Sequence, residues 1–241
     1  MEPIEANLPE PLSHCYTRTV RIETSTGSTA SGFVMTYMKR EWLVTAKHVV
    51  KSSGNQQVKA LDLHGTELPG LKRLPEAVNH LDVAVYRFST EHSEFGASLE
   101  PQTNPPLPSQ DVFFLGFPGL GPGLVTAHPN VPFIKRAMVS GQAVDQEGTV
   151  VWLLDAVNSG GFSGGPLIAS NENGKYSVFA VVSGYVPTEL AVLGVPYLSA
   201  SEEGGAGPRA FVKANSGLMF GFDISHATAT IDQWLGSRPP E

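Results

Sequence analysis

The chain has 241 residues and a formal net charge of −7, from 16 basic and 23 acidic side chains. Hydrophobic residues make up 41% and charged residues 16% of it, which excludes a disordered chain and a coiled coil. No basic stripe offers the electrostatic footprint of a nucleic-acid-binding protein. Folding at this length buries about 70% of the unfolded surface, enough for one large all-β domain or two small ones.

Cysteine content and the first residues bear on the cellular compartment. Cys15 is the single cysteine, so no internal disulfide forms and no oxidising compartment is needed. Residues 1–14 contain acidic residues and prolines and lack the apolar segment of a secretory signal. No apolar run reaches the roughly 18 residues of a membrane span. We therefore expect a cytoplasmic protein that binds neither membrane nor nucleic acid.

The first half of the chain predicts short strands. The 25 glycines and 19 prolines of the whole chain are spread along it without a fixed period, which is typical of β proteins with many turns. Runs rich in Val, Thr, Leu and aromatic residues predict strands at Tyr16–Glu23, Gly32–Tyr37, Trp42–Thr45 and Asp82–Phe88. The proline-rich segment Ala97–Gln110 then predicts a connector between two halves.

The second half repeats this character and ends differently. Strands are predicted at Val112–Gly116, Phe133–Val144, Thr149–Asp155, Tyr176–Tyr185 and Gly217–Ile224. The segment Pro187–Arg209 predicts a long loop, which is either functional or a tolerated surface insertion. The last segment, DISHATATIDQWLG, has apolar residues at helical spacing, with Asp223 or Ser225 available to cap its start and Pro239 beyond its end. It predicts one C-terminal helix.

Three short segments carry chemistry. The run LVTAKH ends at His48, Asp82 opens the apolar run DVAV, and the segment NSGGFSGGPL holds Ser163 between glycines. A serine hydroxyl is a weak nucleophile that needs a general base, which histidine supplies at neutral pH. A carboxylate then orients the imidazole. Backbone N–H groups of Gly161 and Ser163 are the candidates for an oxyanion hole, because glycine admits such backbone geometry.

These motifs together resemble the trypsin-like serine proteases, and most of all their disulfide-free bacterial branch, the HtrA/Deg-like proteases. The likeness extends to Gly27–Phe33, Val112–Pro118 and Gly217–Ile224, and so covers most of the chain. It implies an all-β fold of two six-stranded Greek-key barrels with a C-terminal α-helix and an active site in the cleft between the barrels. The expected parts are a lead-in (1–14), a first barrel (15–100), a linker (101–110), a second barrel (111–224) and a helix with tail (225–241). No PDZ-like domain is expected.

The resemblance also suggests substrate contacts. The residue six before the serine lines the primary pocket in relatives, and here it is Val157. Ser183, Gly184 and Tyr185 would form the pocket wall and pair with the substrate backbone. We expect cleavage of proteins or peptides after small or apolar residues, with no cofactor and no metal.

Phe162 is the main departure from the secreted relatives. They carry an Asp directly before the serine, which pairs with a newly freed N-terminus, and Phe162 stands in its place among the expected substrate-binding residues. Activation by N-terminal insertion is therefore not expected. What orders the loop is left open between a partner, a ligand and oligomerisation. Because a protease in a cytoplasm must be restrained, we expect that its activity is gated, for example by an activating or inhibiting protein partner, or that its substrate is one dedicated protein.

The residues alone offer two alternatives, of which the first is rejected and the second stays open. The run Gly161–Gly165 also fits the G-x-S-x-G elbow of α/β-hydrolases, but that elbow needs a helix straight after the serine, whereas Pro166 and an apolar run follow. The second alternative is a latent or inactive protein that uses a protease fold for binding. The non-catalytic interpretations are a glycine-rich turn for Ser163 and a turn-forming residue for Asp82. Cys15 is expected to be an incidental thiol, and surface positions are expected for His14, His64, His80, His92, His128 and His226.

Overall fold

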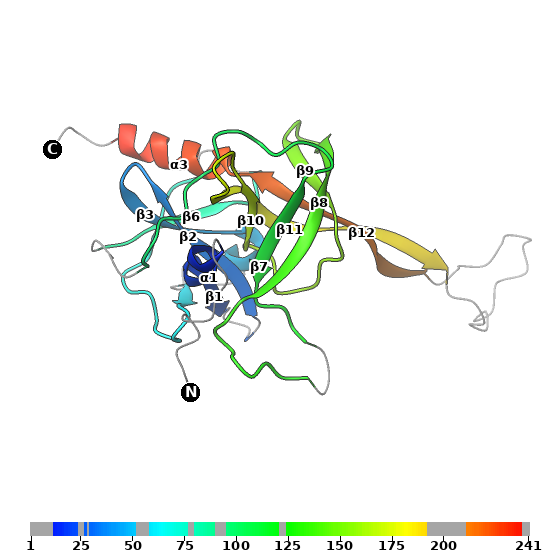
Figure 1. Cartoon of the computed structure of the whole chain (residues 1–241), viewed down its shortest axis with the longest axis horizontal. Coiled ribbons are helices and arrows are strands. Elements are labelled where there is room, and N and C mark those ends of the chain that lie inside the picture. Colours follow the sequence, from blue (N-terminus) through cyan, green and yellow to red (C-terminus); the bar gives the residue numbers. More distant parts are fainter. Residues whose placement is uncertain are drawn as a thin grey trace, which may run out of the picture.

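The computed structural model describes residues 12–23, 27, 29–51, 58–76, 80–89, 95–120, 124–191 and 211–237. The predicted fold class is confirmed: two six-stranded antiparallel units lie together, and the C-terminal helix runs beside the first unit, at the upper left of Figure 1. Most of the lead-in (1–11), residues 192–210 of the predicted long loop, and His92 lie outside the described residues. No helix in the described ranges is long and apolar enough to cross a bilayer.

The first unit is a sheet with strand order β4-β1-β2-β3-β6-β5. Its strands are β1 (Thr19–Glu23), β2 (Thr29–Tyr37), β3 (Arg40–Thr45), β4 (Lys59–Leu61), β5 (Lys72–Arg73) and β6 (Ala84–Arg87). The unit also has two short helices. Helix α1 (Ser13–Arg18) directly precedes β1, and helix α2 (Lys47–Lys51) follows β3. The strand expected from Tyr16 was wrong at its start, because residues 16–18 are helical and Thr19 turns the chain, its hydroxyl donating to the Cys15 carbonyl over 2.7 Å.

The second unit is a closed barrel with strand order β10-β11-β12-β9-β8-β7. Its strands are β7 (Asp111–Gly116), β8 (Phe133–Val144), β9 (Val150–Asp155), β10 (Pro166–Ser170), β11 (Tyr176–Ala191) and β12 (Phe211–Asp223). Because strand β10 rather than a helix follows Ser163, the α/β-hydrolase alternative is excluded.

The last two strands run beyond the barrel. Residues 187–191, expected to lie in a loop, continue β11 and pair with β12 as far as Ala191 opposite Phe211. Together the two strands form a ribbon that projects from the body (Figure 1). The expected loop therefore begins at least five residues later than the sequence indicated.

Apolar side chains gather in three clusters. One fills the first sheet around Val34 and Leu43, and one fills the barrel around Phe114 and Leu154. The third joins the two units. Helix α3 (Ser225–Gly236) belongs to this third cluster. The rings of Trp234 and Trp42 meet edge to face at 5.7 Å, which fastens the helix to the first sheet.

The segment expected to connect the two halves, Ala97–Gln110, is ordered and runs from the first unit to the second. Leu99 is fully buried and its carbonyl accepts a hydrogen bond from Thr36 in β2. Three residues on, Gln102 donates its N–H to the carbonyl of Val178 in β11. The segment is thereby hydrogen-bonded to both units, which fixes one against the other where the site is formed.

Candidate active site

His48 and Asp82 meet because β3 pairs with β6. The register sets Thr45 opposite Ala84, so the residues just after β3 and just before β6 are neighbours. Asp82 Oδ2 lies 2.7 Å from His48 Nδ1, and Asp82 Oδ1 accepts the backbone N–H of His48 at 2.7 Å. The imidazole is 48% exposed and the carboxylate 19% exposed, so the ring faces solvent on a partly buried support.

Ser163 comes from the second unit, in the loop between β9 and β10. Its hydroxyl donates to the carbonyl of Ser183 in β11 over 3.1 Å. The hydroxyl of Ser183 in turn donates to Asp82 Oδ2 over 2.5 Å. Ser183 thus contacts Ser163 through its carbonyl and Asp82 through its hydroxyl, and Asp82 contacts His48. Within the described ranges the Ser163 hydroxyl makes no direct bond to the imidazole, a contact that often tightens only when substrate binds.

The environment of Asp82 keeps it ionised. Burial alone would raise its pKa, but hydrogen bonds from His48 and Ser183 outweigh burial and hold the pKa below its ordinary value. A carboxylate that accepts the Nδ1–H of the imidazole fixes the tautomer in which Nε2 is free to take a proton. The pair therefore has the chemistry of an oriented general base.

The loop before Ser163 exposes backbone donors. Gly161 has φ +102°, and an added Cβ there would collide with the Phe117 carbonyl, so only glycine fits. Among the described residues neither the Gly161 N–H nor the Ser163 N–H donates to a protein acceptor. Two unused N–H groups beside a serine hydroxyl are what an oxyanion hole requires.

Ser31 in β2 was missed by the sequence analysis. It is fully buried, its hydroxyl donates to the Gly161 carbonyl over 2.6 Å, and its N–H donates to the Ser163 carbonyl over 3.0 Å. The one available signal was its place in Gly27–Phe33, a segment already noted for its resemblance. A serine inside a strand pattern does not reveal which distant loop it contacts.

The expected substrate-binding residues differ in exposure. Val157 is 59% exposed, and its carbonyl accepts a hydrogen bond from Lys135. Phe162 is 1% exposed and packs edge to face on Phe114 at 4.9 Å, so any substrate contact falls to its main chain. Tyr185 is 39% exposed. Their roles toward substrate stay predictions.

Asn158, which the sequence analysis did not single out, contacts Gly184 in the expected wall of the substrate pocket. Its side chain is buried, and its amide Nδ2 donates to the Gly184 carbonyl over 3.3 Å. Asn215 in β12 donates to the carbonyl of Asn158 over 2.5 Å. The start of the Ser163 loop is therefore fastened to both long strands of the barrel.

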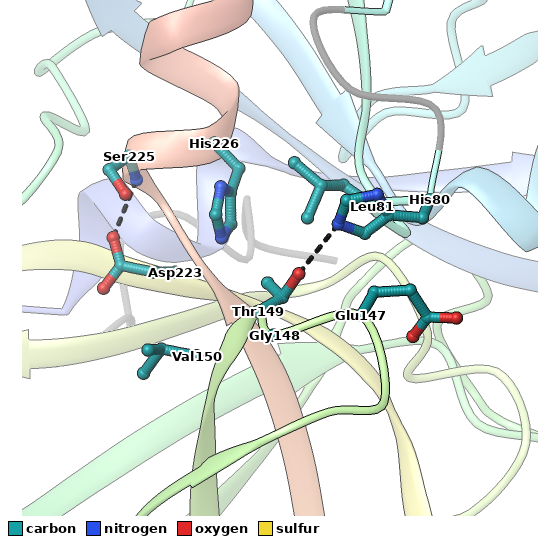
Figure 2. A pocket seen from close by; sticks show the side chains of 9 residues that line it. All are labelled: His80, Leu81, Glu147, Gly148, Thr149, Val150, Asp223, Ser225 and His226. Atoms are coloured by element: carbon teal, nitrogen blue, oxygen red, sulfur yellow. Dashed lines mark hydrogen bonds between the residues drawn. The ribbon is translucent and has the colours of Figure 1, made fainter.

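A separate cavity of about 530 Å³ lies where the 145–149 turn meets the start of α3 (Figure 2). His80 Nε2 lies 2.9 Å from the Thr149 hydroxyl, and burial lowers the pKa of His226 on the opposite wall. Asp223 accepts hydrogen bonds from Trp152 and Ser225. In the described part of the chain no group of three or more His, Cys, Asp or Glu side chains is arranged to hold a metal ion.

Comparison with known proteins decides the family. The family of the trypsin-like peptidase domain matches residues 30–176, a span that includes His48, Asp82 and Ser163. The chain belongs to the trypsin-like serine proteases. No curated protein matches it.

Solved structures of other members of this family share the fold. The active form of the Rv3671c protease from M. tuberculosis is 18% identical, with a TM-score of 0.57 over 97% of this chain and 90% of that one. The HtrA-type protease AlgW with a tripeptide is 17% identical, with a TM-score of 0.61 over 96% of this chain and 63% of AlgW. A serine endoprotease from Yersinia pestis is 16% identical, with a TM-score of 0.57 over 96% and 69%. The trypsin-like protease is thus similar in fold to HtrA-type enzymes.

Proposed function

We propose that this trypsin-like protease is a serine endopeptidase in which Ser163 is the nucleophile, His48 the general base and Asp82 the residue that orients it. The observation that carries the proposal is that Ser183 accepts the Ser163 hydroxyl through its carbonyl and donates its own hydroxyl to Asp82, which in turn contacts His48. These contacts support one site formed by side chains from three separate segments of the sequence.

The reaction follows from these positions. Ser163 Oγ attacks the peptide carbonyl carbon and gives its proton to His48 Nε2. The oxyanion that forms is stabilised by the N–H groups of Gly161 and Ser163. The C–N bond then breaks, and His48 returns the proton to the leaving amine. A water deprotonated by His48 attacks the acyl-enzyme, and the acid product leaves with Ser163 restored.

Substrate preference is proposed from the pocket residues. Val157 carries no charge, so the pocket offers no counter-ion to a Lys or Arg side chain. We expect cleavage after small or apolar residues, with weak discrimination among them, because one methylene is worth about 1–3 kcal/mol in an apolar pocket. We further propose that activity is gated by a protein partner or confined to one dedicated protein substrate. Rapid, unselective degradation of casein by the purified chain would contradict that restriction.

The deciding experiment is labelling with a fluorophosphonate probe, with Ser163→Ala alongside. Labelling of the wild type alone supports the proposal. No labelling of the wild type, alone or with added protein extract, contradicts it and favours the alternative of an inactive binding protein on a protease fold. Labelling that appears only with added extract supports the proposal together with gating by a partner.

A further inference from the structure

The loop that carries Ser163 is held by contacts from outside itself. The Gly160 carbonyl accepts the Gly119 N–H at 3.1 Å, the Gly161 carbonyl accepts the Ser31 hydroxyl at 2.6 Å, and the Ser163 carbonyl accepts the Ser31 N–H at 3.0 Å. Three of the four peptide units from Gly160 to Gly164 are therefore fixed by a partner from another segment. Two of these three contacts come from one residue.

Peptide planarity converts those contacts into directions. The C=O and N–H bonds of a trans peptide lie in one plane and point in opposite directions. Because the Gly160 carbonyl is turned toward Gly119, the Gly161 N–H of the same peptide points the other way. The peptide that carries the Ser163 N–H lies between the two units anchored by Ser31. The Gly161 N–H is therefore oriented through the Gly119 contact. The Ser163 N–H is oriented through the Phe162 carbonyl of its own peptide, which accepts the Gly165 N–H at 2.9 Å, and through the two Ser31 contacts on either side of it.

Ser31 is enclosed and fully hydrogen-bonded, so its side chain has one position. It is 0% exposed, its Oγ accepts the Phe117 N–H at 2.9 Å, and its carbonyl accepts the Thr45 hydroxyl at 2.7 Å. Thr45 ends the strand β3 that leads to His48. The same residue thus touches the strand that delivers the base and the loop that delivers the nucleophile.

We infer that Ser31 is a positioning residue of the oxyanion loop: it anchors the carbonyls of Gly161 and Ser163, on either side of the peptide that carries the Ser163 N–H, and so keeps the loop in the form that leaves the N–H groups of Gly161 and Ser163 available, with no freed N-terminus required. The inference rests on the proposed function for its chemical meaning. The buried ring of Phe162 directly before Ser163 agrees with it, because an apolar anchor there forms no ion pair with an N-terminal amine.

The test is Ser31→Ala, with two readouts. Backbone amide hydrogen exchange in residues 159–165 and at Phe117 is expected to rise at least about tenfold, while exchange in β9 and β12 stays as in the wild type. The fluorophosphonate labelling rate is expected to fall about tenfold to hundredfold, in keeping with the effect of disturbing an oxyanion-hole donor. With a peptide substrate the loss is expected in kcat more than in KM, because the oxyanion exists only in the transition state.

Thr19→Val is the matched control. Thr19 is equally buried in the neighbouring strand, and its hydroxyl also donates to a backbone carbonyl, that of Cys15. This variant is expected to change neither loop exchange nor labelling. Ser31→Cys keeps the side-chain size with a weaker donor, and it serves if the alanine variant fails to fold. Its effects are expected to be intermediate.

The outcomes separate the two proposals. Loop exchange that is unchanged in the folded Ser31→Ala or Ser31→Cys variant, or that rises equally in Thr19→Val, overturns the inference. A wild-type protein that never labels contradicts the proposed catalysis, whereas the exchange comparison still decides whether Ser31 holds the loop.

Discussion

The hydroxyl of Ser183 donates a hydrogen bond to Oδ2 of Asp82 across 2.5 Å, and this contact spans the two units of the fold. Asp82 belongs to the first unit, whereas Ser183 lies in β11 of the second. The carbonyl of Ser183 accepts the Ser163 hydroxyl. One residue therefore connects Ser163, the proposed nucleophile, to the carboxylate that contacts His48.

Ser183→Ala is expected to shift the pH profile of the enzyme. The Ser183 hydrogen bond helps hold the pKa of Asp82 below its ordinary value, so its loss raises that pKa. The part of the acid limb that reflects protonation of Asp82 is expected to move to higher pH, and kcat/KM at neutral pH to fall about tenfold, in line with the lower half of typical acid–base contributions. The pH–rate profile measures both. Ser177→Ala, also buried and on the same strand, is the control and keeps the wild-type profile.

Gly116→Ala is expected to disturb the nucleophile loop by steric overlap. An added Cβ would lie 2.5 Å from the Ser31 hydroxyl and 2.8 Å from a Phe162 ring carbon. Both neighbours are fully enclosed, so overpacking is expected to cost about 1–3 kcal/mol of stability and to slow fluorophosphonate labelling. Urea unfolding and labelling rates check this. Gly236→Ala, with open space around its Cβ, should alter neither; a wild-type labelling rate in Gly116→Ala would refute the steric argument.

Stability is expected to fall at alkaline pH. Burial raises the pKa of the Cys15 thiol and of the Tyr86 hydroxyl to about 12, against ordinary values of 9.0 and 10.0. Both groups are neutral in the fold and ionise earlier in the unfolded chain. Their contribution is therefore complete below pH 9 and is lost between pH 9 and 12, at up to about 1.4 kcal/mol per pH unit for each group.

Denaturant unfolding at several pH values measures this slope. Tyr86→Phe removes one of the two groups and is expected to flatten the decline above pH 10. Tyr185→Phe, at an exposed position, is the matched control and should leave the slope unchanged. Equal slopes in wild type and Tyr86→Phe would contradict the assignment.

Arg18→Ala is expected to destabilise the first unit strongly. The guanidinium is 2% exposed and binds the Glu41 carboxylate at 2.6 and 3.0 Å and the Ala97 carbonyl at 2.5 Å. Its removal leaves a partly buried carboxylate unpaired, at an expected cost of about 3–5 kcal/mol. Thermal and urea unfolding measure the loss. Arg136→Ala breaks an exposed pair with Asp111 and is expected to have no measurable effect; similar losses in both variants would contradict the role of burial.

The strands that surround the motifs could be predicted from the sequence, because they are runs rich in apolar residues that are bounded by turn residues. Phe133–Val144 was predicted to the residue. Strands β4 and β5 were missed because three and two residues give no periodicity. The extension of β11 past Pro187 was missed because proline indicates a loop, whereas it is tolerated where one edge of a strand is unpaired.

The site was predictable only where its residues stand in motifs. His48, Asp82 and Ser163 have local sequence signatures; His48 contacts Asp82 directly, and Ser183 contacts both Asp82 and Ser163. Ser31 lies 132 residues before Ser163 and has no signature of its own, because its role arises from the packing of one unit on the other. Long-range contacts of this kind are the part of a site that single-sequence reasoning cannot reach.

Helix α3 has a consequence for the order in which the chain becomes functional during synthesis. It follows the second barrel in the sequence, yet Ala227 and Ile231 pack in the cluster shared by both units, and Trp234 meets Trp42 of the first sheet. On the ribosome the first sheet emerges early but keeps part of its apolar surface uncovered until α3 has left the exit tunnel. A nascent chain that already contains Ser163 still lacks helix α3, which packs in the cluster shared by both units. The chain is therefore expected to become a competent protease only after α3 has been synthesised and has packed against both units.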